Sequence, residues 1–196
     1  MTITQPDRPQ RRLACRALAL PLLLAGAGAP LLPVAAQAAA PALERRVKAA
    51  FLYKFLGYAD FPPQAFADAA TPLSIGVVGA DDMAAELTRI ATGRMVAGRT
   101  IAVRALREQD LAQSPVHLLF VAGQDGPGAA RLLRASPAWL TVTECEGCLQ
   151  HGSVINFTIV DERVRFDVSL DAAEKKNVKL SSRLLTVANR VQKGAS

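Results

Sequence analysis

Two cysteines three positions apart have the most distinctive chemistry in this chain. Cys145 and Cys148 are followed closely by His151. The spacing fits a disulfide that pins a loop, a redox-active pair, or part of a zinc site that also uses His151. A redox pair favours the start of a helix, which Gly147 in a loop does not supply, and zinc would need a fourth ligand from elsewhere. We therefore expect a structural disulfide between Cys145 and Cys148.

A β-hairpin is predicted directly after these cysteines. Residues 152–170 alternate apolar and polar side chains on either side of Asp161 and Glu162, which suit a two-residue turn. The resulting register pairs Ile155, Phe157 and Ile159 with Val168, Phe166 and Val164 on one face, and pairs Asn156 with Asp167 and Thr158 with Arg165 on the other.

The polar face of this hairpin has two interpretations. Asn156, Arg165 and Asp167 form either a compact set that recognises a small ligand or a cross-strand hydrogen-bonded and charged group on a solvated face. The two differ in whether this face lines an open pocket or is covered by the last helix.

A nucleotide site is not supported by the segment that would have to form it. Residues 73–78 are an apolar strand, Gly79 follows, and a helix begins at Asp81. The glycine fingerprint is missing, and Asp81 and Asp82 put carboxylates where a phosphate would lie. We assign both to helix capping. His117, at the start of a later apolar strand, is interpreted as a structural histidine.

The first helix of the mature chain, residues 43–58, is apolar on two faces. One such face must pack on the core, and the second needs another surface to cover it. We expect a homodimer contact through Leu52, Tyr53 and Leu56. The first stripe consists of Val47, Phe51, Phe55 and Tyr58, and the second of Leu52, Leu56 and Ala59.

The remaining pattern predicts alternating strands and helices. Strands are expected at residues 73–78, within 93–106, at 116–121 and at 139–143, with helices from Asp81, from Gly126 to Ala135, from Asp171 to Lys176, and from Ser181 or Ser182 through Val191. This order indicates one α/β domain, with helices packed on a mixed β-sheet as a Rossmann-like layered sandwich.

The N-terminus has the pattern of a cleaved secretory signal, residues 1–38. A basic stretch precedes an apolar segment from Leu18 to Val34, and Ala36 and Ala38 provide small residues before the cleavage point. Prolines in the apolar segment argue against a membrane-spanning helix. Cleavage would leave 19 basic and 16 acidic residues, a net charge of +3 against +6 for the whole chain. That charge is too small and too scattered to indicate nucleic-acid binding.

The mature chain resembles the YfiR-like family of periplasmic proteins over about residues 46–192. The motifs that carry the resemblance are residues 47–53 with Phe61-Pro62, Gly98-Arg99 with Ile101 and Val103, residues 116–120, 140–142, 155–157 and 164–168, and the run Leu180 to Leu185. The resemblance implies an α/β domain, here residues 43–193, that is often dimeric. It also implies that the redox state of disulfides tunes activity, of which this chain keeps one candidate.

The resemblance further implies a role as a periplasmic repressor. Its partner would be an inner-membrane diguanylate cyclase or a related sensor with a periplasmic domain, and repression would lower cyclic di-GMP and biofilm formation. No paired nucleophile and base and no complete metal set occur in the sequence, so we expect a binding protein that is not an enzyme and carries no cofactor or metal. The alternative is a small-ligand receptor or enzyme that uses the polar face of the 154–168 hairpin.

Overall fold

The computed structural model describes residues 34–194, with side chains from residue 40 onward. Nearly all of the predicted signal segment therefore lies outside the described residues. The first helix, α1 (Val34–Tyr58), begins nine residues before the predicted start at Leu43. The alanine-rich sequence before Pro41 explains this extension, because alanine has the highest helix propensity.

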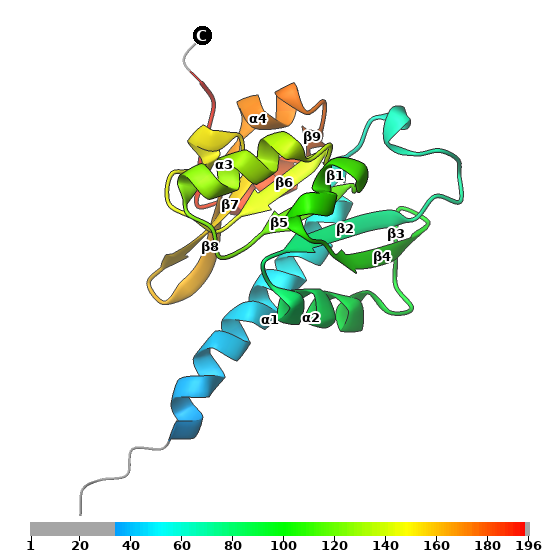
Figure 1. Ribbon diagram of the computed structural model, residues 1–196. Helices are drawn as coiled ribbons and strands as arrows, with labels where there is room; N and C mark the ends of the chain where they lie inside the picture. Colours follow the sequence, from blue (N-terminus) through cyan, green and yellow to red (C-terminus); the bar gives the residue numbers. More distant parts are fainter. Residues whose placement is uncertain (1–33, 195–196) are drawn as a thin grey trace, which may run out of the picture. The chain divides into compact units, whose positions relative to one another are not determined.

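An eight-stranded mixed sheet forms the centre of the domain (Figure 1). Its order is β10-β8-β7-β6-β5-β2-β4-β3. Neighbours from β7 to β4 run parallel, β8 is antiparallel to β7, β10 is parallel to β8, and β3 is antiparallel to β4. The strands are β2 (Leu73–Val78), β3 (Met95–Val96), β4 (Arg99–Ala105), β5 (Leu118–Val121), β6 (Leu140–Thr143), β7 (Ile155–Val160), β8 (Arg163–Ser169) and β10 (Arg190–Gln192).

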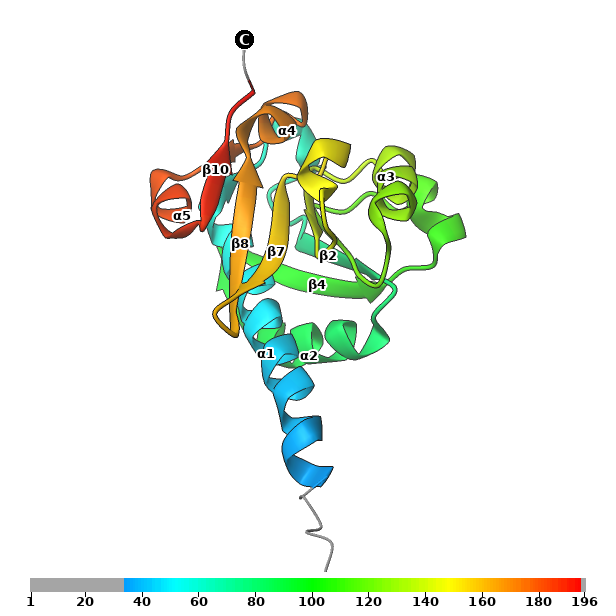
Figure 2. The same cartoon turned by 90° about the vertical axis from the view of Figure 1, so that its left-hand side faces the viewer.

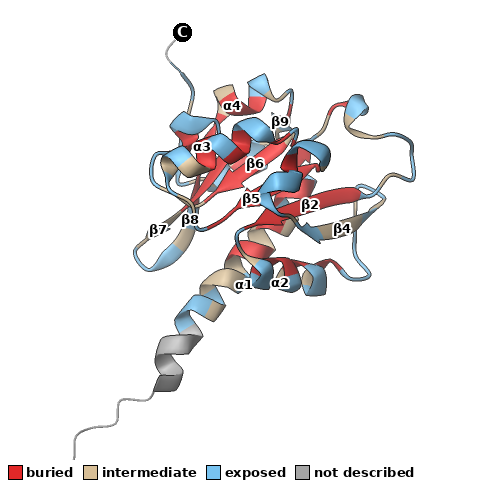
Figure 3. Ribbon diagram, in the orientation of Figure 1, coloured by how far each residue is buried: buried red, intermediate tan, exposed pale blue. Residues whose placement is uncertain are grey.

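Helices cover both faces of this sheet, as predicted (Figure 2). On one face α1, α2 (Asp81–Ala91), α4 (Leu170–Lys175) and α5 (Ser182–Val187) contribute to the larger apolar core. On the other, α3 (Gly126–Ala135) packs with two 3-10 turns, η2 (Glu108–Gln113) and η3 (Cys148–His151). The central strands are buried on both faces, which is typical of parallel strands between helical layers (Figure 3).

The predicted hairpin register is confirmed at every pair from Ile155 with Val168 to Ile159 with Val164. Asp161 and Glu162 form the turn with φ values of 49° and 57°, the geometry of a two-residue turn that matches strand twist. One part of the prediction is wrong. Ile159 is 51% exposed, because the end of the hairpin extends beyond the helices that cover the rest of its apolar face.

The C-terminal elements differ from the prediction in two ways. The cap of α4 is Ser169, whose side chain accepts a hydrogen bond from the Ala172 N–H, so the helix starts before Asp171. The last helix, α5, ends at Val187, and the chain then forms β10 instead of continuing as helix to Val191. A separate two-stranded sheet joins β1 (Ala59–Asp60) to β9 (Lys179–Leu180).

Candidate functional site

The carboxyl edge of the parallel strands, where α/β folds usually bind ligands, is occupied by α1. The connection after β2 leads to one side of the sheet, toward β4, and the connection after β5 leads to the other side, toward β6. The topological switch point, where such sheets usually bind ligands, therefore lies between β2 and β5. A Cβ on Gly79 would lie 2.5 Å from the Ala122 carbonyl oxygen, which means that the two strand ends meet backbone to backbone. Only about 200 Å³ of open volume remains beside them.

Charged side chains of α1 close this edge. The Arg45 guanidinium donates to Asp82 at the start of α2 at 2.5 Å. The Lys48 ammonium donates to Glu144 at 2.7 Å, and it also pairs with Glu44 one turn earlier on α1. Ion pairs of the chain itself therefore fill the position that a ligand would take.

Lys48 is buried yet charged. Burial lowers its pKa, but the hydrogen bonds from the ammonium to Glu144 and Glu44 outweigh this effect and raise the pKa above its usual value. This lysine joins the middle of α1 to the end of β6.

A large hollow lies between the middle of α1 and the tip of the β7–β8 hairpin. We call it the α1–hairpin groove, and its volume is about 800 Å³. Apolar side chains line most of it, and Leu43 is 63% exposed there beside the exposed Ile159. The lining residues are Ala40, Leu43, Glu44, Val47, Phe51, Ile159, Glu162, Arg163, Val164 and Arg165.

The groove has a rigid base and a charged rim. Phe51 contacts Phe55, Phe157 and Phe166 with ring centroids 5.4–6.2 Å apart, so this part of the base is continuous with the core. Glu44 lies on the α1 side, while Glu162 and two arginines lie on the hairpin side. An apolar surface with a rim of both charges is the arrangement of a protein interface.

Sequence reasoning missed this groove, although it placed most of the residues correctly. Val47 and Phe51 were in the predicted core stripe, and Ile159 and Val164 were on the predicted core face of the hairpin. The pattern identifies an apolar face, but it does not reveal that no element of the described chain covers the end of that face.

The predicted disulfide is present: Cys145 and Cys148 are bonded, with Cα atoms 5.5 Å apart. Cys148 is fully buried beneath α3. The Cys145 N–H donates to the side-chain oxygen of Asn156, which also accepts from the Thr143 hydroxyl. The disulfide loop is thereby attached to β7. Among the described residues, no cluster of His, Cys, Asp and Glu is suited to hold a metal ion.

The structure does not bring the three polar hairpin residues together as one recognition set. Asn156 is bound to the disulfide loop, and the Asp167 carboxylate accepts from Asn189 at 2.7 Å and Arg190 at 2.8 Å. Arg165 is exposed and lines the α1–hairpin groove instead. Asn156 and Asp167 line a small hollow of about 100 Å³ beside β10, the sheet neighbour of β8, and the last helix does not contribute to its lining.

The assignment of a dimer contact to Leu52 and Leu56 is corrected by their burial. Leu52 is 0% and Leu56 2% exposed within the chain's own core, so neither side chain is available to a second copy. Both lie on the face of α1 that packs on the sheet and on α2. Tyr53 is half-buried, and the Arg94 guanidinium lies 5.4 Å from the centre of its ring.

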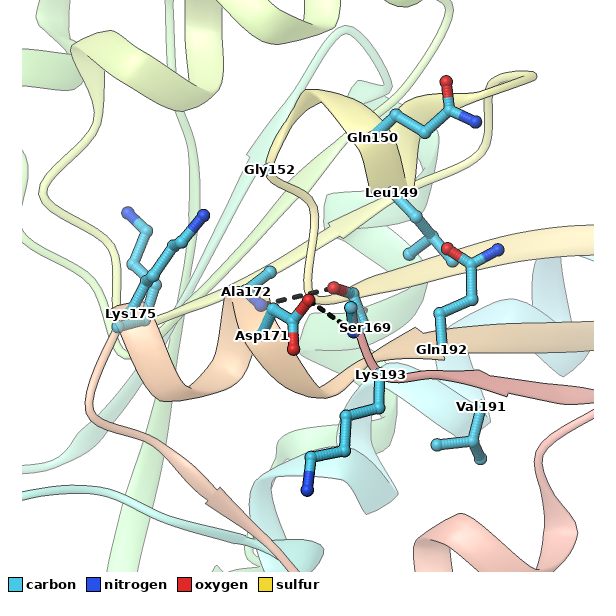
Figure 4. Close-up of a pocket in the computed structure, with 12 residues that line it drawn as sticks. Leu149, Gln150, Gly152, Ser169, Asp171, Ala172, Lys175, Val191, Gln192 and Lys193 are labelled. Atoms are coloured by element: carbon cyan, nitrogen blue, oxygen red, sulfur yellow. Dashed lines mark hydrogen bonds between the residues drawn. The ribbon is translucent and has the colours of Figure 1, made fainter. Parts of the chain in front are cut away.

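A second large hollow, of about 610 Å³, lies beside α4 and β10 (Figure 4). The Asp171 carboxylate there accepts from the Gly194 N–H at 2.6 Å. Lys175 and Lys193 point in opposite directions, and Lys176 donates to the Ala138 carbonyl. Burial lowers the pKa of Lys176. The ammonium groups do not converge on one point, as they would around an anion.

A family model for YfiR/HmsC-like proteins matches residues 45–189, well over half of the chain. The chain belongs to the YfiR/HmsC-like family. No curated protein matches it. None of the helices in the described part of the chain is long and apolar enough to cross a membrane.

Several solved structures, including the following two, are similar over part of the chain. One is a conserved domain protein from Vibrio cholerae O1 biovar El Tor, with a TM-score of 0.46 and 11% identity over 61% of this chain. The other, an ABC domain from Streptococcus pneumoniae in complex with L-Trp, has a TM-score of 0.42 and 12% identity over 61% of this chain. The chain spans 55% of the length of each.

Proposed function

We propose that this protein acts in the periplasm as a non-catalytic repressor of an inner-membrane diguanylate cyclase or a related sensor. It would lower cyclic di-GMP and thereby biofilm formation. Membership of the YfiR/HmsC-like family is the observation that supports this class of partner. The disulfide and the export-type N-terminal sequence support a location outside the cytoplasm.

The α1–hairpin groove is the surface that we assign to the partner. Its apolar lining is uncovered in the described chain, whereas the carboxyl edge of the sheet is filled by ion pairs. A repressor of this kind needs only to bind the inactive state of its partner more tightly than the active state. A difference of a few kcal/mol between the two affinities shifts most of the population.

Deletion of the gene tests the proposed activity. Cellular cyclic di-GMP and surface attachment should rise, and a copy without residues 1–38, retained in the cytoplasm, should not restore repression. Unchanged cyclic di-GMP in the deletion strain, under conditions where the gene is expressed, contradicts the proposal.

Complementation with groove variants tests the assigned surface. Leu43→Asp with Ile159→Asp places two charges in the groove and should abolish repression while leaving the fold intact, because both side chains are exposed. Met95→Asp is the matched control, since Met95 is a similarly exposed apolar residue on β3, outside the groove. Equal repression by the groove and control variants would exclude this surface but not the activity.

A further inference from the structure

A buried histidine without a complete set of hydrogen bonds lies under the segment that joins β1 to β2. His117 is 5% exposed, at the start of β5. Its Nδ1 lies 2.8 Å from the Ser74 hydroxyl oxygen and accepts from the Ser74 backbone N–H at 3.1 Å, which favours the tautomer with the ring proton on Nε2. Nε2 has no partner that meets hydrogen-bond geometry, although the Ala65 carbonyl lies near enough to the ring to raise its pKa slightly against the effect of burial. A buried N–H group without an acceptor lowers the stability of the folded state, and native proteins contain few such groups.

The segment above the ring, residues 61–72, is held to the sheet by two phenylalanines that pack on His117 and by Arg99. The Phe66 ring lies 4.7 Å from the His117 ring, and Phe61 meets it edge-on at 5.4 Å. Arg99 on β4 stacks on Phe66 at 4.0 Å and donates to three carbonyls of the segment, those of Asp68, Ala69 and Thr71. The segment is largely exposed and forms the long loop between β1 and β2 (Figures 1 and 3).

We propose that His117 is a pH-sensitive latch for residues 61–72, which close over the neutral imidazole and are released when the ring takes up a proton. A proton from water would enter at Nδ1. There it would break the hydrogen bond from the Ser74 backbone N–H and would have as acceptor only the Ser74 hydroxyl oxygen, which already accepts from the His117 backbone N–H. The resulting cation would then have one unpaired N–H under the aromatic rings. Release of the segment lets water reach both nitrogens and exposes Phe61 and Phe66 as an apolar surface. This latch is independent of the proposed repressor function.

The surroundings of the ring also oppose its protonation while the segment is closed. Burial lowers the pKa of His117 below its usual value of 6.5, the positive charge of Arg99 lowers it further, and the Ala65 carbonyl opposes both effects. The strands β2, β5 and β6 contain no titratable residue, and residues 61–72 contain only Asp68. That carboxylate hydrogen-bonds to Thr71 and the Ala70 N–H within its own segment.

The size of the effect follows from linkage. When the segment is released, the His117 ring is solvated and has its ordinary affinity for protons. When the segment is closed, the proton affinity of the ring is lower. The ratio of released to closed molecules should therefore rise by about tenfold for each pH unit below 6.5, until the pH reaches the pKa of the closed form. Stability of the closed form is complete above this range and is lost as the pH falls through it.

Hydrogen exchange of the full mature protein between pH 7.5 and pH 4.5 tests the latch, with rates corrected for intrinsic exchange. Protection of residues 61–72 should fall by about tenfold per pH unit while protection of β5 and β6 is retained. The chain has two histidines, so imidazole NMR reports the His117 titration directly, with His151→Asn assigning the other signal.

His117→Asn separates the latch from other effects of acid. Asparagine keeps an acceptor near the position of Nδ1 and stays neutral, so protection of the segment should not change with pH, whereas His151→Asn should behave as wild type. The proposal is overturned if protection of residues 61–72 stays constant through the titration of His117, if the asparagine variant shows the same pH dependence, or if all strands lose protection together.

Discussion

Lys48 links α1 to the end of β6 through its ion pair with Glu144. Lys48→Met keeps the length and apolar stem of the side chain but leaves Glu144 without its cation. We expect a loss of about 2 kcal/mol in unfolding free energy, between the values typical of exposed and fully buried ion pairs. Urea unfolding measures it. Lys54→Met, an exposed lysine on the same helix, is the control and should change stability by less than about 0.5 kcal/mol. If Lys48→Met and Lys54→Met lower the free energy of unfolding equally, the Lys48–Glu144 ion pair adds nothing to stability.

Among the elements, the close junction of β2 and β5 explains why the usual ligand crevice of an α/β sheet is closed here. Gly79 combines a φ of 81° with backbone contact, because an added Cβ would lie 2.5 Å from the Ala122 carbonyl oxygen. Gly79→Ala should therefore destabilise the protein by more than about 2 kcal/mol.

Gly93→Ala is the matched control for this junction. Gly93 has a similar φ of 71°, but a Cβ there would have open space around it, so only the backbone strain of about 1 kcal/mol should remain. Chemical denaturation compares the two variants. If they are equally stable, the strand ends have room to separate, and a ligand crevice could open between them.

For the whole molecule, the homodimer stays a prediction. Of the three residues expected to form the contact, Tyr53 is the one that remains partly exposed. Sedimentation velocity at micromolar concentration should show a dimer for the wild type and a shift toward monomer for Tyr53→Glu. A wild type that sediments as a monomer contradicts the prediction, and the partly exposed ring is then only a packing partner of Arg94.

The sequence alone determined the features that depend on neighbours along the chain. Alternation around Asp161 and Glu162 was sufficient for the whole hairpin register, since a slip of one residue would bury charges. Cys145 and Cys148 are close enough in the chain that few alternatives competed with their disulfide. Helix periodicity and start signals located α2 and α3, whose buried apolar residues share one face.

Only the tertiary structure decided which apolar faces are covered and which polar groups are satisfied. Leu52 and Leu56 resembled a free surface by periodicity, yet the sheet and α2 bury them, while Ile159 resembled core and is exposed. The strand β10 forms where helix was expected: it pairs with β8, and Arg190 binds Asp167 there. Each of these outcomes depends on segments far apart in the chain, and local patterns of polarity contain no information about what such segments will cover.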